Sequence, residues 1–187
     1  TMKICLIAIY MIIALFFFSC DNVKNKKENQ HIDDKQLELS LEEMNRKMLQ
    51  YESELIDNYI EKNNLKVIKT GTGLRYQIFN EGDGNLIKKG DVVTLEYELS
   101  LLSGELLYSS ENDGNKVFLV SRGGVETGLE EAVLKLKKNS ESILILPSHL
   151  AHGLLGDGNK IPPKAIIVYK IKVIDIAFDT GFDSVDG

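Results

Sequence analysis

The segment from Gly153 to Lys160 contains residue types that could bind a phosphate group, because two glycines and a lysine occur within it. In phosphate loops the lysine follows the second glycine directly, and the loop leads into a helix. Here Asn159 separates Gly158 from the lysine, and Ile161-Pro162-Pro163 cannot start such a helix cleanly. The pattern therefore indicates a flexible loop and not a nucleotide site.

Histidine and cysteine side chains are the other candidates for chemistry, since both bind metals. His149 and His152 lie close together in the sequence, but no third ligand stands at a metal-binding spacing from them. Cys5 and Cys20 are the two cysteines, and both precede the polar part of the chain. The rest of the chain has no cysteine for a zinc site or a disulfide, so we expect neither metal nor cofactor.

The composition is that of an ordinary globular protein, and it argues against nucleic-acid binding. The 187 residues are 43% hydrophobic and 27% charged, with a formal net charge of -6. Phosphate backbones are bound by clusters of lysine and arginine. An acidic chain without a basic stripe lacks them, so we expect no nucleic-acid partner.

From Thr70 onward the hydrophobic pattern has the period of β-strands. Apolar residues alternate with polar ones in a half-buried strand that contains Val93, Leu95, Tyr97, Leu99 and Leu101. Residues 142–146 show no alternation, which predicts a strand covered on both faces. Residues 128–136 predict a short helix, and residues 165–176 predict a long final strand. The fold class we expect is α+β, with a curved antiparallel sheet around one short helix.

Four segments follow one another in this region. They are Lys89-Gly90-Asp91-Val92-Val93 with Tyr97 and Ser103-Gly104, then Ser109-Ser110 with Phe118, then Val125-Glu126-Thr127-Gly128-Leu129, and last Pro147 to Gly153 with Ile161-Pro162-Pro163. In this order and spacing the set resembles the FK506-binding-protein (FKBP) family of peptidyl-prolyl cis-trans isomerases. The resemblance implies an FKBP-like fold over residues 65–177, preceded by an N-terminal helix.

The resemblance also implies an activity and a site. Amide resonance opposes rotation by about 18–20 kcal/mol, and a site that binds the twisted amide better than the planar forms lowers this barrier without a nucleophile. Carried over by motif, the pocket residues are Tyr97, Leu107, Phe118, Val125, Glu126, Leu129, His152, Ile161 and Tyr169. The two tyrosines would be walls, Leu129 the floor, and the Glu126 N–H a donor to a substrate carbonyl. Proline-containing clients and a macrolide ligand are the implied partners.

Four positions depart from the pattern of the family. Leu107-Tyr108 stands where Phe-Asp is common, Leu129 where Trp is frequent, and His152 where Tyr is usual. The missing Asp removes a polar contact near the twisting carbonyl, whereas the imidazole of His152 can still donate a hydrogen bond. The Leu107-Tyr108 pair and Leu129 leave an alternative to the isomerase open, a proline-binding chaperone or binding module with little catalysis.

The first twenty residues have the pattern of an export signal. Lys3 precedes an apolar run from Ile4 to Phe18, which is too short for a membrane-spanning helix of about 20 residues but typical of a signal peptide. Ser19-Cys20 follows and resembles the lipobox of bacterial lipoproteins, although Phe17 replaces the usual leucine. The resemblance implies removal of residues 1–19, lipidation of Cys20, and membrane anchoring in the cell envelope, at the periplasmic face or the cell surface. The alternatives are a plain secretory signal and an uncut anchor.

Residues 20–39 are polar and predict a disordered tether. Ser40 and Glu43 form a capping box, which predicts a helix over residues 40–64. The helix carries an apolar stripe of Leu41, Met44, Met48, Tyr51, Leu55 and Tyr59. We favour packing of this stripe on the chain's own domain. The alternative is a dimer seam, and a monomer in light scattering would exclude that alternative. Residues 178–187 predict a loose tail. The whole arrangement is similar to FKBP lipoproteins of gliding Bacteroidetes-type bacteria, and it predicts an isomerase that helps exported proteins to fold.

Overall fold

The structure is a computed structural model that describes residues 34–178. The signal peptide expected at residues 1–19, Cys20, residues 21–33 of the expected tether, and residues 179–187 of the tail lie outside the described residues. In the part of the chain that the structure describes, no helix is long and apolar enough to cross a membrane.

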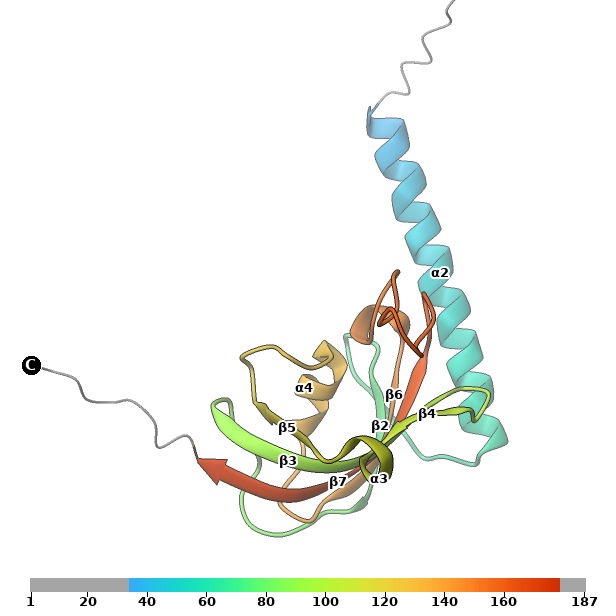
Figure 1. The fold of residues 1–187 in the computed structure, drawn as a ribbon. Helices are drawn as coiled ribbons and strands as arrows, with labels where there is room; N and C mark the ends of the chain where they lie inside the picture. The colour runs from blue at the N-terminus through green and yellow to red at the C-terminus, as the bar shows by residue number, and fades with distance from the viewer. Residues whose placement is uncertain (1–33, 179–187) are drawn as a thin grey trace, which may run out of the picture. The chain divides into compact units, whose positions relative to one another are not determined.

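An antiparallel sheet forms the body of the domain, and Figure 1 shows it curving around the short helix α4. The strands are β1 (Ile68–Lys69), β2 (Arg75–Asn80), β3 (Asp91–Leu101), β4 (Leu106–Ser109), β5 (Lys116–Leu119), β6 (Glu141–Leu146) and β7 (Ile167–Phe178). Their order is β1-β2-β6-β7-β3-β4, with β5 paired to β3. The helices are α2 (Asp34–Lys62), α3 (Ser110–Asp113) and α4 (Thr127–Val133), with the 3-10 turn η1 (Ser148–Leu150). The predicted α+β class is confirmed.

The two faces of the sheet bury different residues of the same strands. On the concave face, Leu144 and Leu146 of β6 and Tyr169 of β7 pack with α4 in the larger core. On the outer face, Ile143 and Ile145 of β6 pack with the C-terminal part of α2. Successive side chains of a strand point to opposite faces. Because both faces of β6 are covered, its side chains are apolar at each of these positions. The prediction of a strand covered on both sides is confirmed.

Helix α2 begins earlier than predicted, at Asp34 instead of Ser40, and it ends at Lys62 instead of residue 64. The prediction relied on the capping box at Ser40 and on the lack of an apolar period before it. Gln36, Leu37 and Glu38 are good helix formers, and a helix does not require an apolar stripe in every turn. Residues 34–39, which we expected in a disordered tether, are therefore helical.

The buried face of α2 is also displaced from the predicted stripe. From Glu43 onward the helix belongs to the same compact unit as the sheet, and its fully buried apolar residue is Ile56, which the stripe omitted. Leu55 and Tyr59 pack beside it. Met44 and Tyr51 are exposed by 62% and 61%. Packing on its own domain is thus confirmed for the last turns of α2, and the dimer seam stays an untested alternative for the exposed stripe.

Strand β7 runs one residue into the expected tail. Phe178 pairs with Asp91 at the start of β3, and the backbone hydrogen bonds of β3 hold this end of β7 in the sheet. Phe178, which we expected in the tail, is therefore part of the sheet.

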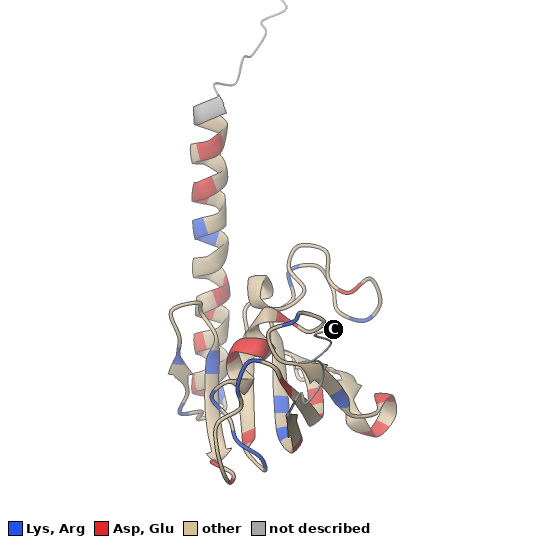
Figure 2. Ribbon diagram, turned by 90° about the vertical axis from the view of Figure 1, so that its left-hand side faces the viewer, with Lys and Arg blue, Asp and Glu red and all other residues tan. Residues whose placement is uncertain are grey.

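Charged residues of both signs are interspersed along α2 and across the strands (Figure 2). On the outer face of the sheet they form cross-strand pairs. Lys170 contacts Glu98 at 3.1 Å, and Lys172 contacts Glu141 at 3.2 Å. All four side chains are more than 40% exposed, and such pairs contribute at most about 1 kcal/mol each.

We predict that Ile56→Ala lowers the free energy of unfolding by about 2–5 kcal/mol, because it leaves a cavity between α2 and the sheet. Leu49→Ala is the matched control on the same helix, since Leu49 is 45% exposed; it should change the free energy by no more than about 0.5 kcal/mol. Urea unfolding followed by circular dichroism measures both. Equal effects of the two substitutions would show that α2 is not packed as described.

Candidate functional site

A cavity of about 320 Å³ opens on the concave side of the sheet, near the N-terminus of α4. Strands β3, β4 and β5 supply one side, α4 begins at another, and the long loop before β7 closes it. Its lining residues are Tyr97, Leu99, Tyr108, Asp113, Lys116, Glu126, His152, Asp157 and Ile161. A second hollow shares Lys116, Glu126 and His152 with it and adds Val125. The two hollows are therefore adjacent, and together they form the candidate site.

The structure brings most of the predicted site residues to this place. Tyr97, Glu126, His152 and Ile161 line the cavity, and Val125 lines the adjoining hollow. Tyr169 is fully buried behind them. Its ring centre lies 5.9 Å from that of Tyr97, with the two planes tilted by 58°.

Leu107, Phe118 and Leu129 belong to the same core cluster as Tyr169 and are not among the residues that line the cavity. Their contact with a substrate stays a prediction. A register shift between Leu99 and Ser100 leaves Leu107 as the extra residue of a β-bulge, which redirects its side chain. Leu129 is fully buried on the sheet-facing side of α4.

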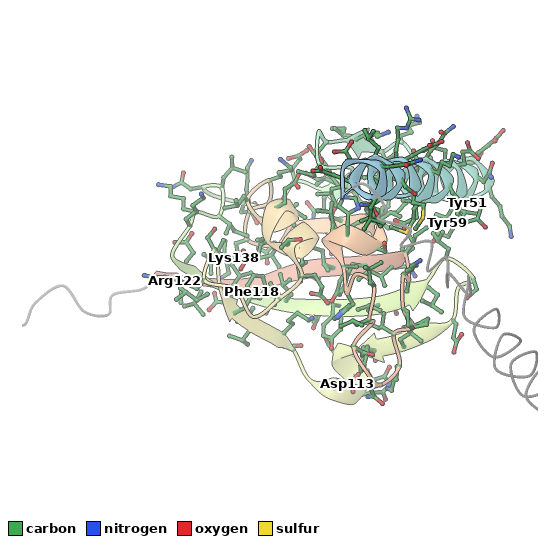
Figure 3. The ribbon with its side chains drawn as sticks, turned by 90° about the horizontal axis from the view of Figure 1, so that it is seen from above. Tyr51, Tyr59, Asp113, Phe118, Arg122 and Lys138 are labelled. Carbon is green, nitrogen blue, oxygen red and sulfur yellow. The ribbon has the colours of Figure 1, made fainter. Side chains whose placement is uncertain are left out.

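Phe118 and Lys116 occupy the same face of β5, opposite Val93 and Leu95 of β3. Figure 3 shows Phe118 well away from Asp113, which lines the cavity. Lys116, two residues before it, takes the cavity position. The sequence reasoning missed this lysine, although a lysine two positions from a buried phenylalanine in a strand indicates an inward-facing charge.

The carboxylate of Glu126 is the centre of a buried polar cluster. Its side chain is 5% exposed. The Tyr169 hydroxyl donates to Oε1 at 2.8 Å, and His152 lies with Nε2 2.9 Å from the same atom. A carboxylate only accepts, so His152 presents its Nε2–H. Oε2 lies 3.5 Å from the Lys116 ammonium and has no hydrogen-bond partner among the described residues.

The surroundings of Glu126 favour its ionised form. Burial by itself raises the pKa of this carboxyl group, but the Lys116 ammonium, its own backbone N–H, the Tyr169 hydroxyl and His152 together hold the pKa below the usual value. The pKa of Tyr169 is raised by burial and by the neighbouring carboxylate. Its hydroxyl therefore keeps its proton and remains a donor.

Lys116 is held over two aromatic rings. Its Nζ atom donates to the Tyr169 hydroxyl oxygen at 2.9 Å and lies 5.2 Å and 5.4 Å from the ring centres of Tyr97 and Tyr169. Cation–π attraction of this kind contributes about 0.5–2 kcal/mol. The side chain is 23% exposed, so one part of the ammonium still faces the cavity.

The loop before β7 is fastened to the cavity through Asp157. The Tyr108 hydroxyl donates to its Oδ2 at 2.5 Å, and the Ile161 N–H donates to Oδ1 at 2.7 Å. Desolvation alone would raise the pKa of Asp157. These two bonds, together with one from the Asn159 N–H, lower that pKa to about 2. A carboxylate thus reaches the cavity beside Tyr108, the position where the FKBP resemblance led us to note a missing Asp.

A larger groove of about 640 Å³ is lined by residues of β3, β4, β6 and β7, and it shares Tyr97 with the cavity. Glu98, Glu141, Lys170 and Lys172 line it, and these four side chains pair with one another. The groove has no buried charge and no aromatic pair, so the cavity beside α4 is the better candidate.

We predict that Lys116→Met destabilises the chain by about 1–3 kcal/mol at neutral pH, because a buried charged group loses a partner. Lys170→Met, which breaks an exposed pair, should cost less than about 1 kcal/mol. Urea unfolding compares the two variants.

The pH dependence follows from the lowered pKa of Glu126. The ionised Glu126 stabilises the fold at pH values above the ordinary pKa of 4.5. This stabilisation is lost as the pH falls through the pKa of the folded state. The difference in free energy of unfolding between Lys116→Met and the unaltered chain should therefore become smaller in acid. A difference that grows as the pH falls would contradict the assignment of the pair.

Known proteins share the fold and much of the sequence of this domain. The family described as FKBP-type peptidyl-prolyl cis-trans isomerase matches residues 84–174. A probable FKBP-type peptidyl-prolyl cis-trans isomerase, FkpA, of Neisseria meningitidis is 39% identical over 108 residues, which are 57% of this chain and 39% of that protein. The chain thus corresponds to well under half the length of this relative.

Two further likenesses extend the comparison. The crystal structure of FkpA from Escherichia coli superposes with a TM-score of 0.60 over 94% of this chain and 82% of that one, at 24% identity, which shows a shared fold. FK506-binding protein 1 of Dictyostelium discoideum is 32% identical over 103 residues, 54% of this chain and 96% of that protein. Because nearly the whole of that small relative is matched, the chain belongs to the family of FKBP-type peptidyl-prolyl cis-trans isomerases.

Proposed function

We propose that this chain catalyses cis-trans rotation of X-Pro bonds in polypeptide clients. The observation that supports the proposal is the convergence of Tyr97, Ile161, Glu126 and His152 on one cavity beside the N-terminus of α4. These residues come from three separate segments of the chain, which are β3, the residue before α4, and the loop before β7. A cavity with aromatic walls and a few fixed polar groups is the usual form of a small binding site.

The reaction needs no nucleophile and no cofactor. Uncatalysed rotation takes on the order of 10–100 s, and the site has to bind the twisted amide better than the planar one. The twisted amide has lost its resonance and carries less charge separation. The ring of Tyr97 and the side chain of Ile161, which line the cavity, favour this less polar form over the planar form. Tyr169 lies behind the Tyr97 ring.

The backbone N–H of Glu126 is the donor that we propose for a substrate carbonyl. Glu126 precedes the first turn of α4 in extended conformation, with φ -60° and ψ 138°, and the first N–H groups of a helix lack intrahelical acceptors. Among residues 34–178, this N–H donates to no backbone carbonyl, although it lies near the carboxylate of Glu126 itself and helps to lower the pKa of that group. A substrate carbonyl at the mouth of the cavity would be an acceptor for it.

A second candidate function is a binding module that holds proline-containing segments with little catalysis. The Lys116–Glu126 pair favours it, since the charges make the cavity more polar than a purely aromatic lining. A macrolide would enter through the same cavity and compete with the peptide in either case.

We further propose that the clients are exported proteins and that the chain is anchored in the cell envelope through Cys20. The support is the apolar run before Ser19-Cys20, and several acyl chains together give stable anchoring. Expression of the chain in a bacterial host with labelled palmitate should give a labelled, membrane-bound product. Cys20→Ser should remove the label and Cys5→Ser should keep it; label on Cys20→Ser would refute the anchor.

We predict that the 187-residue chain accelerates prolyl exchange in a proline tetrapeptide, measured by a protease-coupled assay. Tyr97→Ala should lower kcat/KM by about tenfold or more, because it removes a wall that positions the amide. Tyr51→Ala, at an exposed tyrosine of α2, is the matched control and should retain full activity.

Three outcomes separate the candidate functions. Acceleration of less than a few-fold over buffer, with measurable peptide binding, would favour the binding module. The absence of both acceleration and peptide binding would overturn both candidate functions. Full activity of Tyr97→Ala would mean that the reaction occurs elsewhere on the chain.

A further inference from the structure

Glu52 on α2 is a buried polar residue that the proposed reaction does not use. The residue is 4% exposed, and both of its carboxyl oxygens accept hydrogen bonds from one residue, Ser148. The Ser148 N–H donates to Oε2 at 2.9 Å, and its hydroxyl donates to Oε1 at 2.5 Å. The two residues are 96 positions apart in the chain.

Ser148 is the first residue of the turn that carries His152 into the cavity. Its carbonyl oxygen accepts the N–H of Ala151 at 3.1 Å and the N–H of Gly153 at 2.8 Å. These two residues flank His152, whose Nε2 reaches Glu126 at 2.9 Å. The position of Ser148 therefore determines where the backbone lies on both sides of His152.

The helix that presents Glu52 is itself fixed to the sheet. Ile56, one turn later, is fully buried against the outer face. Arg75 of β2 donates from Nη2 to the Ser53 hydroxyl at 2.6 Å and contacts Asp57 at 3.4 Å. Apolar and polar contacts thus hold the turn of α2 that contains Glu52, and they leave its carboxyl group little freedom.

Loss of this acceptor would release the turn. Ser148 is 2% exposed, so without Glu52 its N–H and hydroxyl would be buried without partners. Buried donors without acceptors cost about 1–3 kcal/mol each, and the turn would open toward water to satisfy them. His152 would move with it, because its neighbours are bound to the Ser148 carbonyl.

We propose that Glu52 is a positioning residue, which fixes the cavity turn through Ser148 and so places His152 beside Glu126. The inference deepens the proposed function and rests on it for the effect on activity. It makes the last turns of α2 part of the catalytic unit, although α2 contributes no residue to the cavity.

The test compares Glu52→Leu, Glu52→Gln and Glu54→Leu in the full chain. Leucine fills the space but accepts no hydrogen bond, whereas glutamine can still accept from the Ser148 N–H and pair with its hydroxyl. Glu54 is exposed on the same helix and is the matched control. Backbone amide resonances of residues 148–153 and the ring resonances of His152 report the turn, and the prolyl-exchange assay gives kcat and KM separately.

We expect Glu52→Leu to shift the resonances of residues 148–153 and to lower kcat/KM by about tenfold, while it still unfolds cooperatively. Glu52→Gln should restore kcat/KM to within about twofold, as a conservative replacement that keeps the bonds. Glu54→Leu should match the unaltered chain. Unchanged turn resonances in folded Glu52→Leu, or equal effects of Glu52→Leu and Glu54→Leu, would overturn the inference.

A second variant covers the case in which Glu52→Leu fails to fold. Ser148→Ala removes the hydroxyl bond alone, and it should shift the same resonances while the rest of the spectrum is unchanged. A spectrum of Ser148→Ala without shifts at residues 149–153 would overturn the inference. If the unaltered chain shows no activity, the proposed function fails, and the resonances alone decide the role of Glu52.

Discussion

The buried carboxylate of Glu126 is the constraint around which the site is arranged. An ionised group can stay inside a protein only where donors and an opposite charge replace its water. Tyr169, His152 and Lys116 supply them, from β7, the cavity turn and β5. Each of these side chains also borders the cavity or its aromatic wall, so the contacts that satisfy one charge also determine where a substrate amide can lie.

This arrangement depends on a sheet that is covered on both faces. The concave core holds α4, whose N-terminus presents Glu126, while the outer face holds the last turns of α2 through Ile56. Gly128 of α4 packs so closely on β6 that an added Cβ would lie 2.7 Å from Leu146. Helix and strand therefore meet without space for a side chain, and the N-terminus of α4 has a defined position over the sheet.

Patterns of burial were predictable from the sequence, and individual polar partners were not. The alternation of β3 and the unbroken apolar run of β6 follow from period and hydrophobicity, and the structure has both. Asp157 and Glu52 acquire their roles from residues far along the chain, for which local sequence carries no signal. Lys116 differs, because its spacing from the buried Phe118 indicates an inward-facing side chain. The register shift beside Leu107 depends on strand pairing, which motif matching does not include. The early start of α2 depends on helix propensity, which motif matching also leaves out.

The central claim, that the cavity beside α4 binds the X-Pro amide, is tested most directly by following backbone amide resonances while a proline-containing tetrapeptide is added to the full chain. The account predicts that the largest shifts occur at Val125, Glu126 and His152, with the Glu126 N–H moving as it gains an acceptor. Shifts confined to the outer groove, at residues such as Glu98 and Lys170, would contradict it.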